Sequence, residues 1–155
     1  MDNFTKNEIK GRMVWAYYLA NHGVKKNTFS ENKYCHYDGT LTGLTDITAI
    51  YELKYRDIPT DTYEEWMIEE KKAVPLKDSA IISGYDRCLY IVITMDDILV
   101  WDILPTALTY QTQYCTKTTA EDYHKGEIPK SVAFLNIKDT ICKIKRKDGL
   151  RLLLS

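Results

Sequence analysis

The sequence has no pair of cysteines at metal-binding spacing and no long apolar run. Its four cysteines stand far apart, which argues against a structural zinc site or a disulfide framework and favours buried thiols. With 7 glycines and 4 prolines in 155 residues, the chain is neither collagenous nor of low complexity. No apolar stretch approaches the roughly 20 residues that span a bilayer, and the N-terminus lacks a secretory pattern. We therefore expect a cytoplasmic protein that does not associate with membranes.

Neither sign of charge dominates the sequence. The 21 basic and 22 acidic residues give a formal net charge of -1, so any attraction to nucleic acid must come from local clusters. Hydrophobic residues make up 45% of the chain, which is ordinary for a globular protein. The length and composition together predict a single domain over residues 1–155 with its own core.

The pattern of apolar residues predicts that the chain opens with a helix and a β-hairpin. Apolar side chains recur at helical steps over residues 5–22, and Gly23 can adopt the left-handed conformation that ends a helix. The apolar positions of this helix are Ile9, Met13, Ala16, Tyr17 and Ala20. Residues 33–40 and 46–57 are rich in aromatic and β-branched residues at a period of two, which is typical of paired strands.

The rest of the chain predicts a second helix and three further strands. Thr60 or Thr62 can cap a helix that runs to about Val74 and stops at Pro75. Strands are expected over residues 88–94, 98–104 and 132–137, and a short helical turn over residues 118–123. This order of elements predicts a fold that mixes helices with a sheet.

The predicted hairpin brings two acidic residues together. With a loop near Thr45, residues whose numbers sum to 90 face each other, which sets Asp38 opposite Glu52 and His36 opposite Lys54. Opposed β-carbons lie about 4.5 to 5.5 Å apart, so the two carboxylates repel unless a divalent cation such as magnesium or manganese bridges them. Lys54 projects on the same face, where an ammonium can orient water or hold a phosphate. The alternative is an exposed strand face with an ordinary salt bridge.

The strand that carries Glu52 is expected to be covered on both faces. One face is apolar, and its residues are Ile47, Ala49, Tyr51, Leu53 and Tyr55. Ile50 lies on the other face, with Glu52 and Lys54, and indicates that this face is covered as well. Glu52 and Lys54 should therefore be partly buried and in need of partners.

An acid, a β-hairpin, the motif Glu52-Leu53-Lys54 and flanking helices follow one another in this order. The arrangement resembles the PD-(D/E)XK nuclease superfamily, and in particular small phage or mobile-element nucleases, although Tyr37 replaces the proline before the acid. The resemblance covers about residues 5–104. It implies a restriction-endonuclease-like fold of the α/β (α+β) class, a mixed central β-sheet flanked by helices with an αβββαβ core.

The resemblance also implies roles for individual residues. Asp38 and Glu52 would bind one or two Mg (or Mn) ions, with the Leu53 carbonyl and Glu8 of the first helix as further ligands. Lys54 would lie beside the attacking water as the third catalytic residue. Predicted nucleic-acid contacts come from the second helix, the end of the hairpin and the most basic stretch of the chain: Arg56, Lys72, Lys143, Lys145 and Arg146.

These observations favour a magnesium-dependent endo- or exodeoxyribonuclease that hydrolyses phosphodiester bonds in DNA. It would act in the cytoplasm, which is the host cytoplasm if a phage encodes it, and a homodimer would suit the cutting of two strands. The alternative is a catalytically inactive nuclease-like fold that binds nucleic acid or protein, for example as an inhibitor. A structural assembly component is a third hypothesis. The sequence leaves open whether the substrate is DNA or RNA, and whether it is single- or double-stranded.

Overall fold

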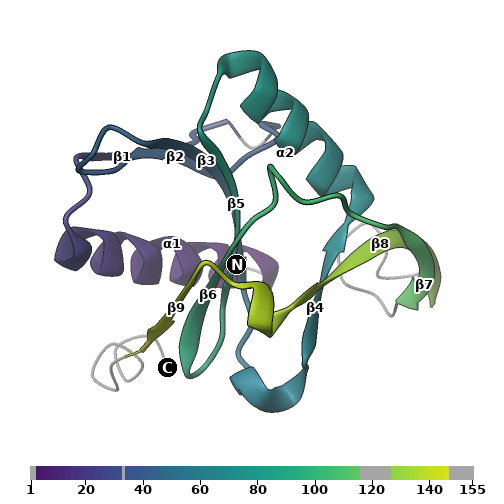
Figure 1. Cartoon of the computed structure of the whole chain (residues 1–155). Coiled ribbons are helices and arrows are strands. Elements are labelled where there is room, and N and C mark those ends of the chain that lie inside the picture. The colour runs from purple at the N-terminus through teal and green to yellow at the C-terminus, as the bar shows by residue number, and fades with distance from the viewer. Residues whose placement is uncertain (1–2, 33, 116–126, 147–155) are drawn as a thin grey trace.

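The computed structural model describes residues 3–32, 34–115 and 127–146, and it places them in two helices and two sheets (Figure 1). The larger sheet has six strands in the order β1-β2-β3-β5-β6-β9. Its strands are β1 (Lys26–Phe29), β2 (Gly39–Thr42), β3 (Thr48–Tyr55), β5 (Arg87–Ile93), β6 (Asp97–Asp102) and β9 (Cys142–Lys145). Strands β3 and β5 are parallel, and every other neighbouring pair in this sheet is antiparallel.

Each face of the larger sheet has its own core and its own helix. Helix α1 (Asn3–His22) covers the face that buries Tyr51 of β3 and Ile91 of β5. Helix α2 (Glu70–Ser83) packs on the opposite face, against Ile50 and Val92. The chain thus runs from α1 through a three-stranded meander and crosses over by α2 to the parallel strand β5. This is the αβββαβ core in a mixed sheet flanked by helices, so the predicted fold class is confirmed.

A second, antiparallel sheet lies beside this core, with the strand order β4-β8-β7. It consists of β4 (Glu65–Glu69), β8 (Ile128–Asn136) and β7 (Gln111–Cys115). Strand β8 confirms the strand predicted over 132–137, whereas β4 and β7 were not predicted. Two 3₁₀ helices, η1 (Thr60–Thr62) and η2 (Ile137–Asp139), precede β4 and follow β8. The helical turn predicted over 118–123 lies outside the described residues.

The second helix begins later than the sequence predicted. Residues 60–62 form η1 and residues 65–69 form β4, so α2 starts at Glu70 and continues through Pro75 to a left-handed Gly84. The cap signals at Thr60 and Thr62 were therefore misleading: the Thr60 hydroxyl donates instead to the Asp97 carboxylate, at 2.6 Å. Proline was also a poor stop signal, because it costs one helical hydrogen bond and packing of the helix on the sheet can offset that loss.

Helix α1 confirms the predicted helix, starting two residues earlier and ending at the predicted His22, but it buries a different face from the predicted one. Val14, Trp15, Tyr18 and Leu19 are buried against the sheet. The predicted apolar positions are exposed, with 42% exposure for Ile9, 52% for Met13 and 38% for Tyr17. Apolar residues occupy two faces of this helix, and periodicity alone does not indicate which one meets the sheet.

The hairpin register is confirmed. Strand β2 pairs with β3 so that Gly39 faces Tyr51 and Thr40 faces Ile50, each pair of numbers summing to 90. The turn falls at residues 43–47, where Asp46 has a φ of 67°. Strand β2 starts only at Gly39, where a β-carbon would lie 2.3 Å from the Tyr51 hydroxyl oxygen and 2.7 Å from the Thr28 carbonyl oxygen. Glycine is thus required directly after Asp38.

The other predicted strands and the state of the cysteines agree with the structure. Strands β5 and β6 confirm the pair expected at residues 88–94 and 98–104. All four cysteines are free, and Cys88 and Cys115 are buried. No helix within the described ranges is both long and apolar enough to cross a membrane.

Candidate active site around Glu52

Glu52 is a carboxylate buried in the middle of the larger sheet. β-branched and aromatic residues make β3 a strand, and its apolar residues are buried on both faces. Glu52 is 5% exposed and faces Tyr90 in the parallel ladder with β5. This confirms that Glu52 is buried, and a buried carboxylate needs partners because desolvation penalises its charged form.

Two lysines converge on one oxygen of this carboxylate. Lys54 Nζ lies 3.3 Å from Glu52 Oε1, because two steps along a strand return the chain to the same face. Lys72 Nζ lies 3.8 Å from the same oxygen and comes from the first turn of α2. Both lysine side chains keep solvent contact, with 26% and 45% exposure. They are therefore able to reach a bound ligand as well as Glu52.

Asp38 stands at the start of β2, beside the same stretch of β3. Its backbone N–H donates to the Tyr51 carbonyl oxygen at 2.9 Å, and its Oδ2 accepts from the Leu53 N–H at 2.7 Å. These two hydrogen bonds bracket Glu52 in the sequence and hold the Asp38 carboxylate next to it. The β2–β3 ladder ends at the Gly39–Tyr51 pair, so Asp38 lies one residue beyond it, and its own hydrogen bonds place it beside Glu52.

The electrostatics of Glu52 reflect this crowding. Burial raises the pKa of the Glu52 carboxyl, and the neighbouring Asp38 carboxylate raises it too. Lys54 and Lys72 lower it without cancelling the effect of burial, so that the pKa of Glu52 remains above its usual value. A divalent cation, with twice the charge of a lysine, would stabilise the charged form of this buried carboxylate and reduce its repulsion with Asp38.

The donor set fits a magnesium-type ion held by few protein ligands. No group of three or more His, Cys, Asp or Glu side chains in the described part of the chain is arranged to hold a metal. Mg²⁺ keeps several waters and is commonly bound by one or two carboxylates plus substrate phosphates, at about 2.0 to 2.1 Å. Two carboxylates such as Asp38 and Glu52 therefore suit it, whereas a dedicated protein cage would need more acids.

The remaining residues predicted around the metal are placed differently. Glu8 forms an ion pair with Arg12, at 3.5 Å, and is not gathered with Asp38 and Glu52 into a larger acidic group. Leu53 touches the site through its N–H, which binds Asp38. His36 precedes β2 in a loop, so it is not paired with Lys54 across a ladder as expected.

The predicted nucleic-acid contacts divide into near and distant groups. Lys72 touches Glu52, and Arg56 is exposed directly after β3. Lys143 and Lys145 are exposed on β9, three strands from β3 in the sheet, which corresponds to about 14 Å. Arg146, also predicted as a nucleic-acid contact, is 6% exposed and donates to the Thr94 carbonyl oxygen at 2.6 Å. Its guanidinium is therefore held within the fold.

A second acid flanked by two lysines lies where the second sheet meets α2. Lys130 Nζ of β8 is 2.8 Å from Glu69 Oε1, and Lys71 Nζ is 3.4 Å from Glu69 Oε2. Burial tends to raise the pKa of Glu69, but Lys130 and Lys71 lower it below its usual value. The sequence did not reveal this cluster, because it depends on the pairing of β4 with β8, whose charged residues are 61 positions apart.

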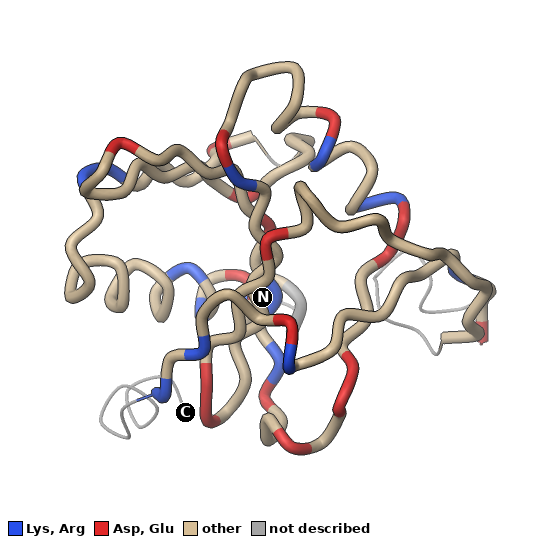
Figure 2. Tube along the Cα trace, in the orientation of Figure 1, with Lys and Arg blue, Asp and Glu red and all other residues tan. Residues whose placement is uncertain are grey.

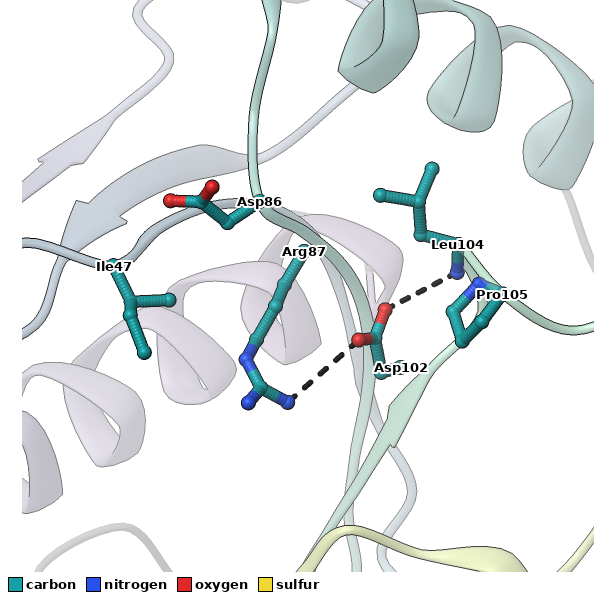
Figure 3. Close-up of a pocket in the computed structure, with 6 residues that line it drawn as sticks. All are labelled: Ile47, Asp86, Arg87, Asp102, Leu104 and Pro105. Carbon is teal, nitrogen blue, oxygen red and sulfur yellow. Dashed lines mark hydrogen bonds and ion pairs between the residues drawn. The ribbon is translucent and has the colours of Figure 1, made fainter.

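Two hollows of the surface are not lined by Glu52. One of about 480 Å³ is lined by Ile47, Asp86, Arg87, Asp102, Leu104 and Pro105 (Figure 3). Arg87 faces Ala49, at the opposite end of β3 from Lys54, and pairs with Asp102 at 3.7 Å. Asp102 also accepts from the N–H groups of Cys88 and Leu104. These charges are satisfied within the fold and indicate a structural role.

The order of elements and the mixed sheet flanked by helices agree with the αβββαβ core that the resemblance implied. No protein-family model matches the chain, and no curated protein matches its sequence. Among solved structures, the chain is similar to Hjc from Archaeoglobus fulgidus, a Holliday junction resolvase from an archaeal hyperthermophile. That similarity has a TM-score of 0.47 at 10% identity and covers 79% of this chain and 93% of Hjc.

Proposed function

We propose that this protein is a metal-dependent nuclease that hydrolyses phosphodiester bonds in DNA. The observation that carries the proposal is the buried Glu52 carboxylate, which stands beside Asp38 and under the ammonium groups of Lys54 and Lys72. A buried acid with a raised pKa beside charged partners is a feature of functional sites, and its position in this fold favours phosphodiester chemistry.

Asp38 and Glu52 would hold one Mg²⁺ or Mn²⁺ ion, with the Leu53 carbonyl as a further ligand. A bound ion of this kind lowers the pKa of a water molecule and neutralises charge on a phosphate. Lys54 would leave its pairing with Glu52 and donate to the attacking water or to a phosphate oxygen, where charge develops during the reaction. Because both residues belong to β3, Glu52 and Lys54 would stay on the same face of the sheet during the reaction.

Substrate binding would use the basic residues around this carboxylate. Lys72 and Arg56 would contact the phosphates next to the scissile bond. Lys143 and Lys145, about three strand spacings away, would meet a more distant part of a long substrate. Basic and acidic positions alternate along the described part of the trace in Figure 2, and the formal net charge is -1, so affinity would depend on these few residues and on salt concentration.

The proposal is tested by incubating the purified chain with supercoiled plasmid and with linear duplex DNA, in Mg²⁺, Mn²⁺ or EDTA. Cleavage should require the metal and should be abolished in Asp38→Asn, with the far-ultraviolet circular dichroism spectrum unchanged. Asp86→Asn is the matched control, because Asp86 is an acid with its own backbone partner far from Glu52. Equal cleavage by Asp38→Asn and the unmodified chain would refute the assignment.

One observation favours the alternative of an inactive nuclease-like binding module. Lys54 and Lys72 already compensate part of the charge of Glu52, so the protein does not depend on a metal to keep this acid buried. Titration calorimetry with Mn²⁺ separates the two functions. Binding that Asp38→Asn abolishes supports the enzyme, whereas the absence of binding supports the module.

A further inference from the structure

Strand β7 is exposed on both of its faces and carries no charge. Gln111, Thr112, Gln113 and Tyr114 are all exposed, and Tyr114 retains 65% of its accessible surface. Edge strands commonly bear lysines that keep other strands away. Strands β1 and β9, at the edges of the larger sheet, follow this rule, while β7 at the edge of the second sheet offers amides and hydroxyls. Its surface therefore suits a partner that forms hydrogen bonds.

The strand register connects β7 to the candidate active site. Gln111 faces Val132 of β8, which faces Glu69 of β4, and Gln113 faces Lys130. Residues directly opposed in a sheet share a face, so both glutamines lie on the face that carries the Glu69–Lys130 pair. Two strand spacings set β7 about 10 Å from β4.

Strand β4 is in turn fixed against the residues around Glu52. The Tyr90 hydroxyl donates to the Met67 carbonyl oxygen of β4 at 3.0 Å, and Tyr90 is the neighbour of Glu52 in the β5 ladder. Glu69 is followed directly by α2, whose Lys72 lies 3.8 Å from Glu52 Oε1. The second sheet is thus joined to the site through β4, and β7 is its far strand (Figure 1).

From Glu52 through β4 and β8 to β7, the side chains change from cationic to neutral. Lys54 and Lys72 lie at the site, and the glutamines lie beyond the Glu69–Lys130 pair. Cations suit phosphates, which position a nucleic acid without reading it, whereas glutamine amides both donate and accept and pair with base edges, adenine above all.

We propose that Gln111 and Gln113 contact base edges in the major groove of duplex DNA and give the protein a sequence preference. This inference rests on the proposed function, because DNA bound at Glu52 would bring its next base pairs under β7. The substrate class is then a double-stranded DNA of which a few base pairs beside the cleaved phosphate are read. Among the described residues β7 is the last strand of its sheet, and β7 of a second copy is a competing occupant that the test below includes.

The test selects bound sequences from a library of random 30-base-pair duplexes in EDTA, where metal-dependent cleavage does not interfere. The unmodified chain should enrich a short motif. The double variant Gln111→Ala, Gln113→Ala should still bind DNA, but its enrichment of the motif should fall by roughly 5-fold or more for each glutamine–base contact that is lost. Thr112→Ala is the matched control, because Thr112 is exposed on the opposite face of the same strand and should leave the motif unchanged.

Enrichment that survives in the double variant, or no enrichment by the unmodified chain, would overturn the inference. Light scattering of the same samples covers the other occupant: a dimer that the β7 edge variant Gln113→Lys converts to a monomer would assign β7 to self-association. Cleavage of plasmid DNA in Mg²⁺ without any selected motif would leave the proposed function intact and remove only the base contacts. If the unmodified chain neither cleaves nor binds DNA, both the proposed function and the base contacts are refuted.

Discussion

Glu52 and Glu69 are two acids that each have two lysine partners, yet the pKa of one is raised and the pKa of the other is lowered. Each lies between two lysines, Lys54 and Lys72 for Glu52, and Lys130 and Lys71 for Glu69. The pKa of Glu52 is raised by burial, whereas the lysines outweigh burial at Glu69 and lower its pKa. The number of ion pairs is the same at the two sites, although the pKa shifts of the two carboxyls have opposite signs.

The difference comes from depth, distance and a neighbouring acid. The Glu52 side chain is 6% exposed and has Asp38 beside it, and its lysines are 3.3 and 3.8 Å away. The Glu69 side chain is 21% exposed and receives a hydrogen bond of 2.8 Å from Lys130. Glu69 is thus a satisfied structural ion pair. Glu52 retains an unfavourable charge that a substrate-bound cation would relieve, which is the arrangement expected of a working site.

The largest expected effect separates the lysines by activity. Lys54→Ala should reduce the rate of DNA cleavage by about 10²- to 10³-fold, which is typical for the loss of one group that stabilises developing charge. Lys71→Ala removes the equivalent lysine from Glu69 and should leave the rate within about 2-fold, because it removes an exposed ion pair. Single-turnover cleavage in Mg²⁺ measures both. A similar loss of rate in the two variants would contradict the functional distinction between the acids.

The second prediction concerns the stability of the fold and compares the two lysines that pair with Glu69. Lys130→Met should lower the free energy of unfolding by about 1 to 3 kcal/mol, because it leaves a half-buried carboxylate without its closest donor. The less buried Lys71 should contribute about 0 to 1 kcal/mol when replaced by methionine. Urea titrations followed by tryptophan fluorescence give both values. If Lys71→Met were the more damaging variant, the structural role of Lys130 would be wrong.

The third prediction concerns the sign of the effect of each acid. Without metal, Glu52→Gln should raise the free energy of unfolding by about 0.5 to 2 kcal/mol, as often happens when a strained functional group is removed. Glu69→Gln should lower it, because that carboxylate is stabilised by its lysines. Added Mn²⁺ should then stabilise the unmodified chain and not Glu52→Gln. Thermal melts in EDTA and in Mn²⁺ test this, and a destabilised Glu52→Gln would place the two acids in the same class.

Of the two acids, the surroundings of Glu52 could be predicted from the sequence, because they depend on residues that are close to it along the chain. The register that pairs β2 with β3 follows from a turn and a period of two, so the placement of Asp38 beside Glu52 could be derived in advance. Lys54 follows from the same periodicity. The burial of Glu52 was also predictable, because Ile50 showed that its face of the strand is covered.

Long-range pairing is what the sequence did not reveal. The Glu69–Lys130 pair requires β4 and β8 to meet across 61 residues, and neither strand pattern specifies its partner. The buried face of α1 and the burial of Arg146 escaped prediction for the same reason: each depends on which other element covers it. Local periodicity gives the face of an element, and tertiary contacts decide which face is inside.

The smallest expected effect is a difference in pH dependence. Because the pKa of Glu69 lies below its ordinary value of 4.5, Glu69 contributes stability above pH 4.5 and loses it as the pH falls through the folded value. The raised pKa of Glu52 reverses the sign: its unfavourable contribution is present at high pH and disappears as the pH falls toward 4.5. In EDTA, the stability advantage of Glu52→Gln should therefore be present at neutral pH and be lost as the pH falls to 4.5. The stability deficit of Glu69→Gln should persist at pH 4.5 and be lost only as the pH falls further. Urea titrations between pH 3 and 8 measure both differences. Two differences that disappeared in the same pH range would mean that burial does not distinguish these acids, because the order of the two transitions follows directly from the opposite directions of the shifts.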